Sequence, residues 1–322
     1  MTRGQERSGL AFAGLCALSA AFVPAFAKLT TGAADGLFVA AATSVFAGLA
    51  AAVLLAARGE LGRLFARDRL PYLLAIGALG TAVTFLLFYE GARRTSAILT
   101  ALCLQIEPVY SLLLARVALG HPITTRRLAA VAAILTGIAL ALSPAGAAGW
   151  LGVALLLVTP LGWQLSHLIV LRRLGEVAPP TLTGARYLFG GALLAAAWAA
   201  SGGATRLPEG DALARLVPVL ALQGVVLSFV GTLLWYATIA RLDLARATSI
   251  VVPSIPLLSL GASFLLLGEV AGPREWAGLI LTAAGVLAFV TAPDAHEPRV
   301  RVPSPTAPIA VADPQGADGP HR

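Results

Sequence analysis

The chain has 322 residues, of which 58% are hydrophobic and 12% are charged, and its formal net charge is +7. Soluble domains contain roughly 45–50% apolar and about 25% charged residues, so this composition excludes an ordinary water-soluble fold. The positive charge does not indicate nucleic-acid binding, because the arginines lie between apolar runs and do not cluster with aromatic residues on one soluble face.

Apolar runs recur along the chain at lengths that fit membrane-spanning helices. A span of about 20 apolar residues crosses ~30 Å of hydrocarbon, and lipid offers the backbone no hydrogen-bond partners, so helices are the expected form. The predicted spans cover residues 9–27, 35–57, 70–90, 95–119, 127–144, 149–171, 181–200, 216–238, 246–267 and 274–291. We therefore predict an all-α membrane protein with ten transmembrane helices.

The two ends of the chain differ from the spans between them. The first run follows Arg3 and Arg7 and ends at Ala25-Phe26-Ala27, which resembles a signal-peptidase site, so cleavage of this run stays open. Residues 293–322 contain seven prolines and few large apolar residues, which predicts a disordered Pro-rich tail.

The loops indicate how the chain is oriented in the membrane. With the N-terminus inside, the cytoplasmic loops hold fifteen arginines and the outer loops six arginines or lysines. Positive charge accumulates on the cytoplasmic side, so both termini are expected there, which requires an even number of spans.

A weak internal repeat appears when the sequence is shifted by 148 residues. Ala92-Arg93 then falls on Ala240-Arg241, and Pro108 falls on Pro256. Because each half holds five spans, an odd number, the second half must enter the membrane in the opposite sense, and such inverted repeats recur in secondary transporters. The predicted units are a first five-helix repeat over 1–145, a second over 146–292, and the cytoplasmic tail over 293–322.

At these repeated positions the chain resembles the EamA-type members of the drug/metabolite transporter superfamily. The residues that carry the resemblance are Glu90 to Ser96, Glu107-Pro108-Val109-Tyr110, Leu119-Gly120-His121-Pro122, Gly137, Pro256, Leu267-Gly268-Glu269, Trp276-Ala277-Gly278 and Gly285. The resemblance implies a solute carrier whose cavity is lined by spans one, three, four, six, eight and nine. His121 stands where the family often has an acidic residue, so the first half departs from the usual pattern.

Glu107 is the first candidate for a binding residue, because an ionisable group inside a span costs ~3 kcal/mol or more and is functional by default. On a helix, Tyr110 and Ser111 share its face and could line the same cavity. The alternative is structural: Glu107 satisfies backbone groups near Pro108, or pairs with a buried arginine.

The sixth span carries a polar and aromatic stripe at helical spacing. Pro160, Trp163, Gln164 and His167 fall along one face, which must contact protein or water instead of lipid. Trp163 could form a wall of a substrate pocket, and His167 could titrate near neutral pH. Packing for Trp163 and a hydrogen-bonded position for His167 remain the alternatives.

Three other residues are candidates on less evidence. Ser254 lies between Pro253 and Pro256, which are expected to break the ninth span as Pro108 breaks the fourth, with plain kinks as the alternative. Lys28 ends the first span and serves either as an anchor or, as the resemblance implies, as a pocket residue. Arg186 is expected to reach the headgroups, although an inward orientation would suit a carboxylate-bearing substrate.

The sequence thus predicts a secondary transporter that exports small metabolites, amino acids or drug-like solutes across the cytoplasmic membrane by alternating access. An intramembrane enzyme acting on lipid, or a non-transporting scaffold subunit, is the alternative, but no nucleophile–base or metal-ligand pattern supports catalysis. We expect no metal and no cofactor, and neither the substrate nor the oligomeric state follows from the sequence.

Overall fold

The computed structural model describes residues 3–120, 122–142, 146–242 and 244–292, and every regular element within these ranges is helical. His121 and the predicted tail lie outside the described residues. The elements are α1 (Arg3–Ala33), α2 (Gly36–Ala57), η1 (Leu61–Phe65), α3 (Leu70–Gly77), η2 (Ala78–Val83), α4 (Thr84–Arg94), α5 (Ala97–Leu104), α6 (Glu107–Leu119), α7 (Thr125–Ala141), α8 (Gly146–Arg173), α9 (Pro179–Ala200), η3 (Gly203–Arg206), α10 (Gly210–Leu222), η4 (Gln223–Val230), α11 (Gly231–Ile239), α12 (Leu244–Leu267) and α13 (Pro273–Val290).

Eight helical stretches in the described residues are long and apolar enough to cross a membrane. The other two predicted spans coincide with α7, which has 17 residues, and α9, and neither is among the eight. Large apolar side chains cover the outside of the bundle: Val53 is 70% exposed and Leu265 is 74% exposed. Water would disfavour such a surface and lipid would not, so the chain is a multi-pass membrane protein.

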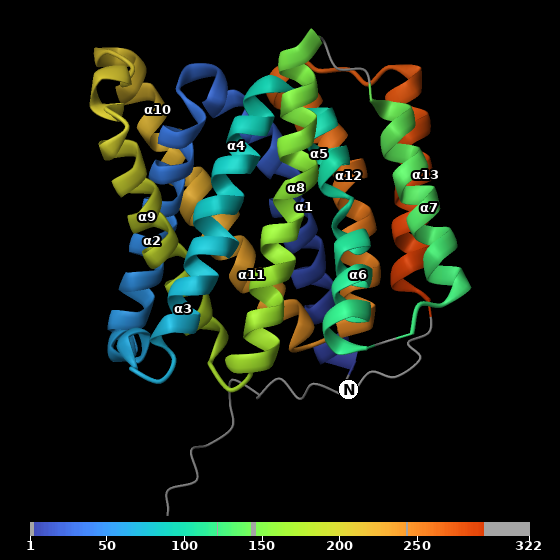
Figure 1. Ribbon diagram of the computed structural model, residues 1–322, viewed down its shortest axis with the longest axis horizontal. Helices are drawn as coiled ribbons and strands as arrows, with labels where there is room; N and C mark the ends of the chain where they lie inside the picture. The colour runs from blue at the N-terminus through green and yellow to red at the C-terminus, as the bar shows by residue number, and fades with distance from the viewer. Residues whose placement is uncertain (1–2, 121, 143–145, 243, 293–322) are drawn as a thin grey trace, which may run out of the picture.

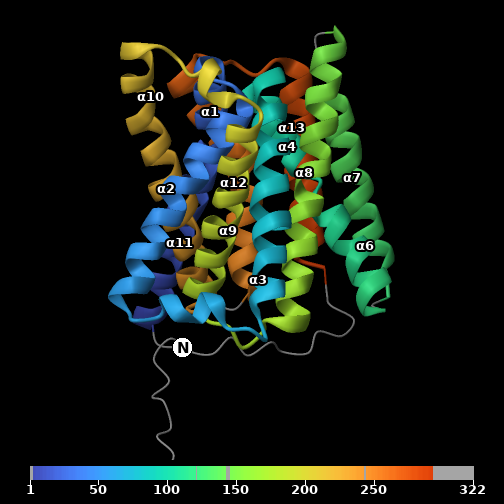
Figure 2. The same ribbon diagram turned by 60° about the vertical axis from the view of Figure 1, so that its left-hand side comes forward.

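The helices stand side by side and run alternately between two ends of the bundle (Figures 1 and 2). We call the end where α1 begins the lower end and the opposite end, where α4 ends and α5 begins, the upper end, as in Figure 1. The most extensive packing joins α1 to α12, α2 to α9, α4 to α8, and α7 to α13. Each of these pairs combines one helix before residue 145 with one after it, so the core lies between the two parts of the chain.

Glycines allow the closest of these approaches. A Cβ at Gly278 would lie 2.7 Å from the Cβ of Ala141, and one at Gly285 would lie 2.9 Å from the Ala130 carbonyl oxygen, so α7 and α13 touch backbone to backbone. Small residues stabilise helix association in lipid in this way, because the hydrophobic effect contributes little there.

Prolines act differently in the two parts of the chain. The fourth predicted span is interrupted between Leu104 and Glu107, and Pro108 falls in the first turn of α6, where its missing N–H costs nothing. The expectation of an equivalent break at Pro253 and Pro256 was wrong, because α12 continues as one helix through both. Each proline removes a single donor, and packing against α1 holds the α12 backbone in place.

Two stretches of wide, π-type helix interrupt the third and eighth predicted spans. They are η2, between α3 and α4, and η4, between α10 and α11. Shifted by 148 residues, η2 would cover 226–231 and therefore overlaps η4. Wide turns of this kind are rare and often mark functional sites, because they change which backbone groups are available to neighbours.

Candidate functional site

Glu107 and Gln164, two of the predicted site residues, meet in the interior. Glu107 is the first residue of α6, near the middle of the stretch that α5 and α6 form together. Its half-buried carboxylate accepts a hydrogen bond from Gln164 on α8, with 2.7 Å between Nε2 and Oε1. The helix break before Pro108 and the polar face of α8 thus contribute to one site. The sequence did not predict this contact, because the two residues lie 57 positions apart.

Arg186 corrects a second expectation. Its side chain does not extend to the headgroups but points into the bundle, where Nη2 donates to the Gly80 carbonyl oxygen in η2 at 2.9 Å. The reason is local packing: α9 lies against η2, and a missing side chain at Gly80 leaves room for the guanidinium stem. An arginine within a membrane span needs such acceptors, since an unpaired charge there is expensive.

Arg186 is the centre of a polar cluster drawn from several helices. It interacts electrostatically with Glu107, His167 and Tyr236. His167 is nevertheless exposed, and Glu107 and Tyr236 are half-buried, so these groups line an accessible surface instead of a sealed core. In the described part of the chain Arg186 and Glu107 form no direct ion pair. The two side chains interact electrostatically without touching.

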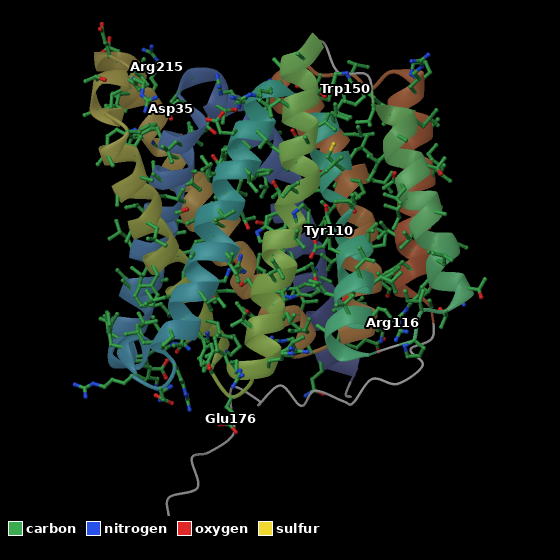
Figure 3. The ribbon with its side chains drawn as sticks, in the orientation of Figure 1. Asp35, Tyr110, Arg116, Trp150, Glu176 and Arg215 are labelled. Atoms are coloured by element: carbon green, nitrogen blue, oxygen red, sulfur yellow. The ribbon has the colours of Figure 1, made fainter. Side chains whose placement is uncertain are left out.

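The other predicted site residues have different surroundings. Tyr110 lies where α6 meets α8 (Figure 3), and its hydroxyl donates to the Leu157 carbonyl oxygen at 2.9 Å. Ser254 donates to the Ile250 carbonyl oxygen of its own helix at 2.6 Å. Trp163 and Ser111 are half-buried. A role of these four residues in substrate binding stays a prediction.

Lys28 lies at the upper end of the bundle, in a set of contacts that ties helix ends together. Its Nζ donates to the carbonyl oxygens of Ala92 and Arg93, the last turn of α4, where a cation is favourable. Nearby, the Glu269 carboxylate accepts backbone N–H groups of Ala97 and Ile98 at distances of 2.9 to 3.2 Å. Glu269 thereby caps α5 from the loop between α12 and α13.

A fully buried polar network, which the sequence reading missed, connects three more elements. Gln223, the first residue of η4, donates from Nε2 to the Tyr89 hydroxyl at 2.9 Å, and Thr30 donates to its Oε1 at 3.3 Å. Gln223 is 0% exposed and Tyr89 is 1% exposed. A glutamine inside an apolar run was the available signal, because a buried amide needs partners.

The arrangement suits binding of a polar solute. An anion and a cation are presented between helices at mid-bundle, and no group of three or more His, Cys, Asp or Glu residues that could hold a metal ion occurs in the described ranges. Together with the membrane-spanning fold, these features define a polytopic small-molecule transporter.

Comparison with known proteins agrees with this class. The sequence profile of the EamA-like transporter family matches residues 7–143 and again residues 150–291. A protein of Streptantibioticus cattleyicolor named "Probable terminal-alkyne amino-acid exporter" is 30% identical over 263 residues, which are 79% of this chain and 84% of that protein. An "Uncharacterized transporter" of Archaeoglobus fulgidus is 25% identical over 71% of this chain and 81% of its own length.

A solved crystal structure shares the fold, with a TM-score of 0.60 and 17% identity over 88% of this chain and 96% of that one. The two matches of the family profile cover most of the chain, so the protein belongs to the EamA-like transporter family. The family and the names of the relatives point to transport of small molecules.

Proposed function

We propose that this transporter exports amino acids, or small zwitterions of similar size, across the cytoplasmic membrane. The observation that carries the proposal is a pair of oppositely charged side chains that do not touch each other. Glu107 accepts a hydrogen bond from Gln164, and Arg186 donates one to the Gly80 carbonyl oxygen. The two side chains interact electrostatically without direct contact. An amino acid holds an ammonium and a carboxylate on one carbon. Bound between the two side chains, it gives each of them a partner and leaves no charge uncompensated in a low-dielectric surrounding.

Each side chain has a role in this proposal. The Glu107 carboxylate accepts from the ammonium, and the planar guanidinium of Arg186 binds the carboxylate through paired N–H donors. Trp163 and Tyr110 form apolar walls, His167 lies at the accessible mouth beside Arg186, and Ser111 and Ser254 offer hydroxyls along the crevice. Lys28 acts at the upper end, away from this pair, as part of the contacts that close it.

We further propose ten spans arranged as two inverted repeats, with both termini cytoplasmic. The helix packing supports this reading, since the contact of α4 with α8 has a counterpart, 148 residues along, in the contact of α11 with α1. Two halves related in this way can exchange conformations, so that one end closes as the other opens. The ties at the upper end would hold the crevice closed on the outer side.

The relatives support the class of solute and the direction. The Streptantibioticus protein is named as an amino-acid exporter, and its similarity extends over most of both chains. The sequence contains no GxxxxGK[ST] motif, so we propose that a solute or proton gradient drives export without ATP.

Counterflow in liposomes tests the proposal. Purified protein is reconstituted with a panel of L-amino acids, including the terminal-alkyne amino acid propargylglycine, and with small amines that lack the carboxylate. At least one amino acid should exchange, and Glu107→Gln and Arg186→Gln should each lower its exchange about tenfold or more, since each removes a charged partner. Arg215→Gln, at an exposed residue of α10 without a hydrogen bond or ion pair in the described ranges, is the control.

Two results would overturn the proposal. One is the absence of counterflow for every amino acid while wild-type protein exchanges an amine. The other is exchange by the Glu107 and Arg186 variants at the rate of the Arg215 control.

A further inference from the structure

The wide turns η2 and η4 present backbone carbonyls to two consecutive residues of α9. Arg186 donates to the Gly80 carbonyl oxygen of η2 at 2.9 Å, and the Tyr187 hydroxyl donates to the Ser228 carbonyl oxygen of η4 at 3.2 Å. Gly80 and Ser228 stand 148 residues apart, which is the offset of the internal repeat. The same turn of α9 is therefore attached to both predicted halves.

The local backbone of η2 explains why a carbonyl oxygen in the middle of a helix can accept a hydrogen bond from a side chain. The Thr84 N–H is directed to the Thr81 carbonyl, and the Thr84 hydroxyl donates to the Leu79 carbonyl at 2.5 Å. In a regular helix the Thr84 N–H would bond to Gly80, four residues earlier. The Thr84 N–H is thus directed away from the Gly80 carbonyl oxygen, and Arg186 donates to that oxygen.

Glycine at position 80 is required by its surroundings. A Cβ there would lie 2.6 Å from Oγ and 2.9 Å from Cβ of Ser166, and 3.2 Å from Nε of Arg186. Ser166 is 1% exposed and belongs to α8, so it has no room to withdraw. A larger residue would also crowd the Arg186 guanidinium, whose Nε lies 3.2 Å from the Cβ position, and would disturb its contact with the Gly80 carbonyl.

From these contacts we propose that Gly80 is a positioning residue for solute specificity. Its carbonyl and its missing side chain hold the guanidinium of Arg186 at a fixed place, within electrostatic range of Glu107, so that the carboxylate of a zwitterion is recognised. This inference rests on the proposed function, because it assigns the carboxylate to Arg186. It adds that specificity depends on η2 through its hydrogen bond to Arg186.

The first test compares matched solutes that differ only in the carboxylate. Propargylglycine, leucine and phenylalanine are measured against but-3-yn-1-amine, isoamylamine and phenethylamine. Gly80→Ala should raise KM for the amino acids about tenfold and leave KM for the amines within about twofold, because the amines have no carboxylate for Arg186 to bind. Gly261→Ala is the control, since a Cβ at Gly261 would meet nothing within 4 Å.

A second-site variant separates positioning from general damage. Gly80→Ala combined with Ser166→Gly removes the contacts at 2.6 and 2.9 Å and should restore a large part of the lost preference for amino acids. Failure of this rescue, or an equal loss of amino-acid and amine transport in Gly80→Ala, would overturn the inference.

A measurement without solute tests the same contact if no amino acid is transported. Thermal unfolding midpoints are compared for wild type, Gly80→Ala, Arg186→Met and the double variant. The effect of Arg186→Met should be clearly smaller in the Gly80→Ala background, because the hydrogen bond is already lost there. If the midpoint shifts of the two single variants add up in the double variant, the positioning of Arg186 by Gly80 is refuted. If the shifts do not add up but no amino acid is exchanged, only the proposed function is refuted.

Discussion

Glu269 offers a sharp test of how the upper end of the bundle is held together. Its half-buried carboxylate accepts from the Ala97 N–H at 3.1 and 2.9 Å and from the Ile98 N–H at 3.2 Å, across a sequence separation of about 170 residues. These two donors belong to the first turn of α5 and have no partner within their own helix. We predict that Glu269→Ala destabilises the protein by releasing α5 from the loop between α12 and α13.

The magnitude follows from the contacts that are lost. A hydrogen bond to a charged group contributes about 1.5–3 kcal/mol, and a negative charge at a helix N-terminus adds about 0.3–1 kcal/mol. Water can reach a half-buried site and recovers part of this, so we expect a net loss of about 2 kcal/mol for Glu269→Ala. Glu269→Gln keeps one acceptor oxygen without the charge, and about half that loss is expected.

Thermal unfolding in detergent measures the effect. At roughly 2–4 °C per kcal/mol for a large chain, Glu269→Ala should lower the midpoint by about 4–8 °C. Glu209→Ala is the matched control, because Glu209 also stands at a helix start but makes no side-chain cap to α10. If the Glu269 and Glu209 variants have the same midpoint, the capping interaction does not stabilise the fold and the reasoning is refuted.

Three further outcomes are expected. Gln223→Leu should cost about 1–3 kcal/mol, because Tyr89 loses its partner in a dry site; equal midpoints for this variant and wild type would contradict the network. Gly137→Ala should lower the midpoint more than Gly14→Ala, since a Cβ at Gly137 would lie 2.7 Å from a backbone oxygen and one at Gly14 would meet nothing within 4 Å. Lys28→Met should lower the free energy of unfolding by about 1 kcal/mol, because the last turn of α4 loses its cap. An unchanged unfolding midpoint would argue against that cap.

Hydropathy predicted the helical class because a helix is a local property of the chain, and eight helical stretches in the described residues are long and apolar enough to cross a membrane. The stretch around Glu107 was predicted as a span broken at Pro108, and the structure has the break between α5 and α6. The same reasoning failed for Pro253 and Pro256, since a proline only weakens a helix and the packing of α12 on α1 decides whether it bends.

For the candidate site, the sequence identified single residues but not their partners. Glu107 and Gln164 were both chosen for polarity inside apolar runs, yet their hydrogen bond depends on how α6 meets α8. Arg186 was expected to reach the headgroups, because nothing in the neighbouring sequence indicates the Gly80 carbonyl, 106 residues earlier. Glu269 was noticed as part of a family motif, while its cap on α5 is visible only in three dimensions.

By itself the sequence determined that this protein lies in a lipid membrane, that it is helical, and which family it resembles. Transfer of apolar residues into lipid and satisfaction of the backbone within helices depend on composition over about 20 consecutive residues, which any linear reading contains. Tertiary structure alone decided which charges face each other, where the wide turns present carbonyls, and which helix ends are tied. These features depend on contacts between residues some 50 to 190 positions apart, and such contacts are set by the packing of whole helices.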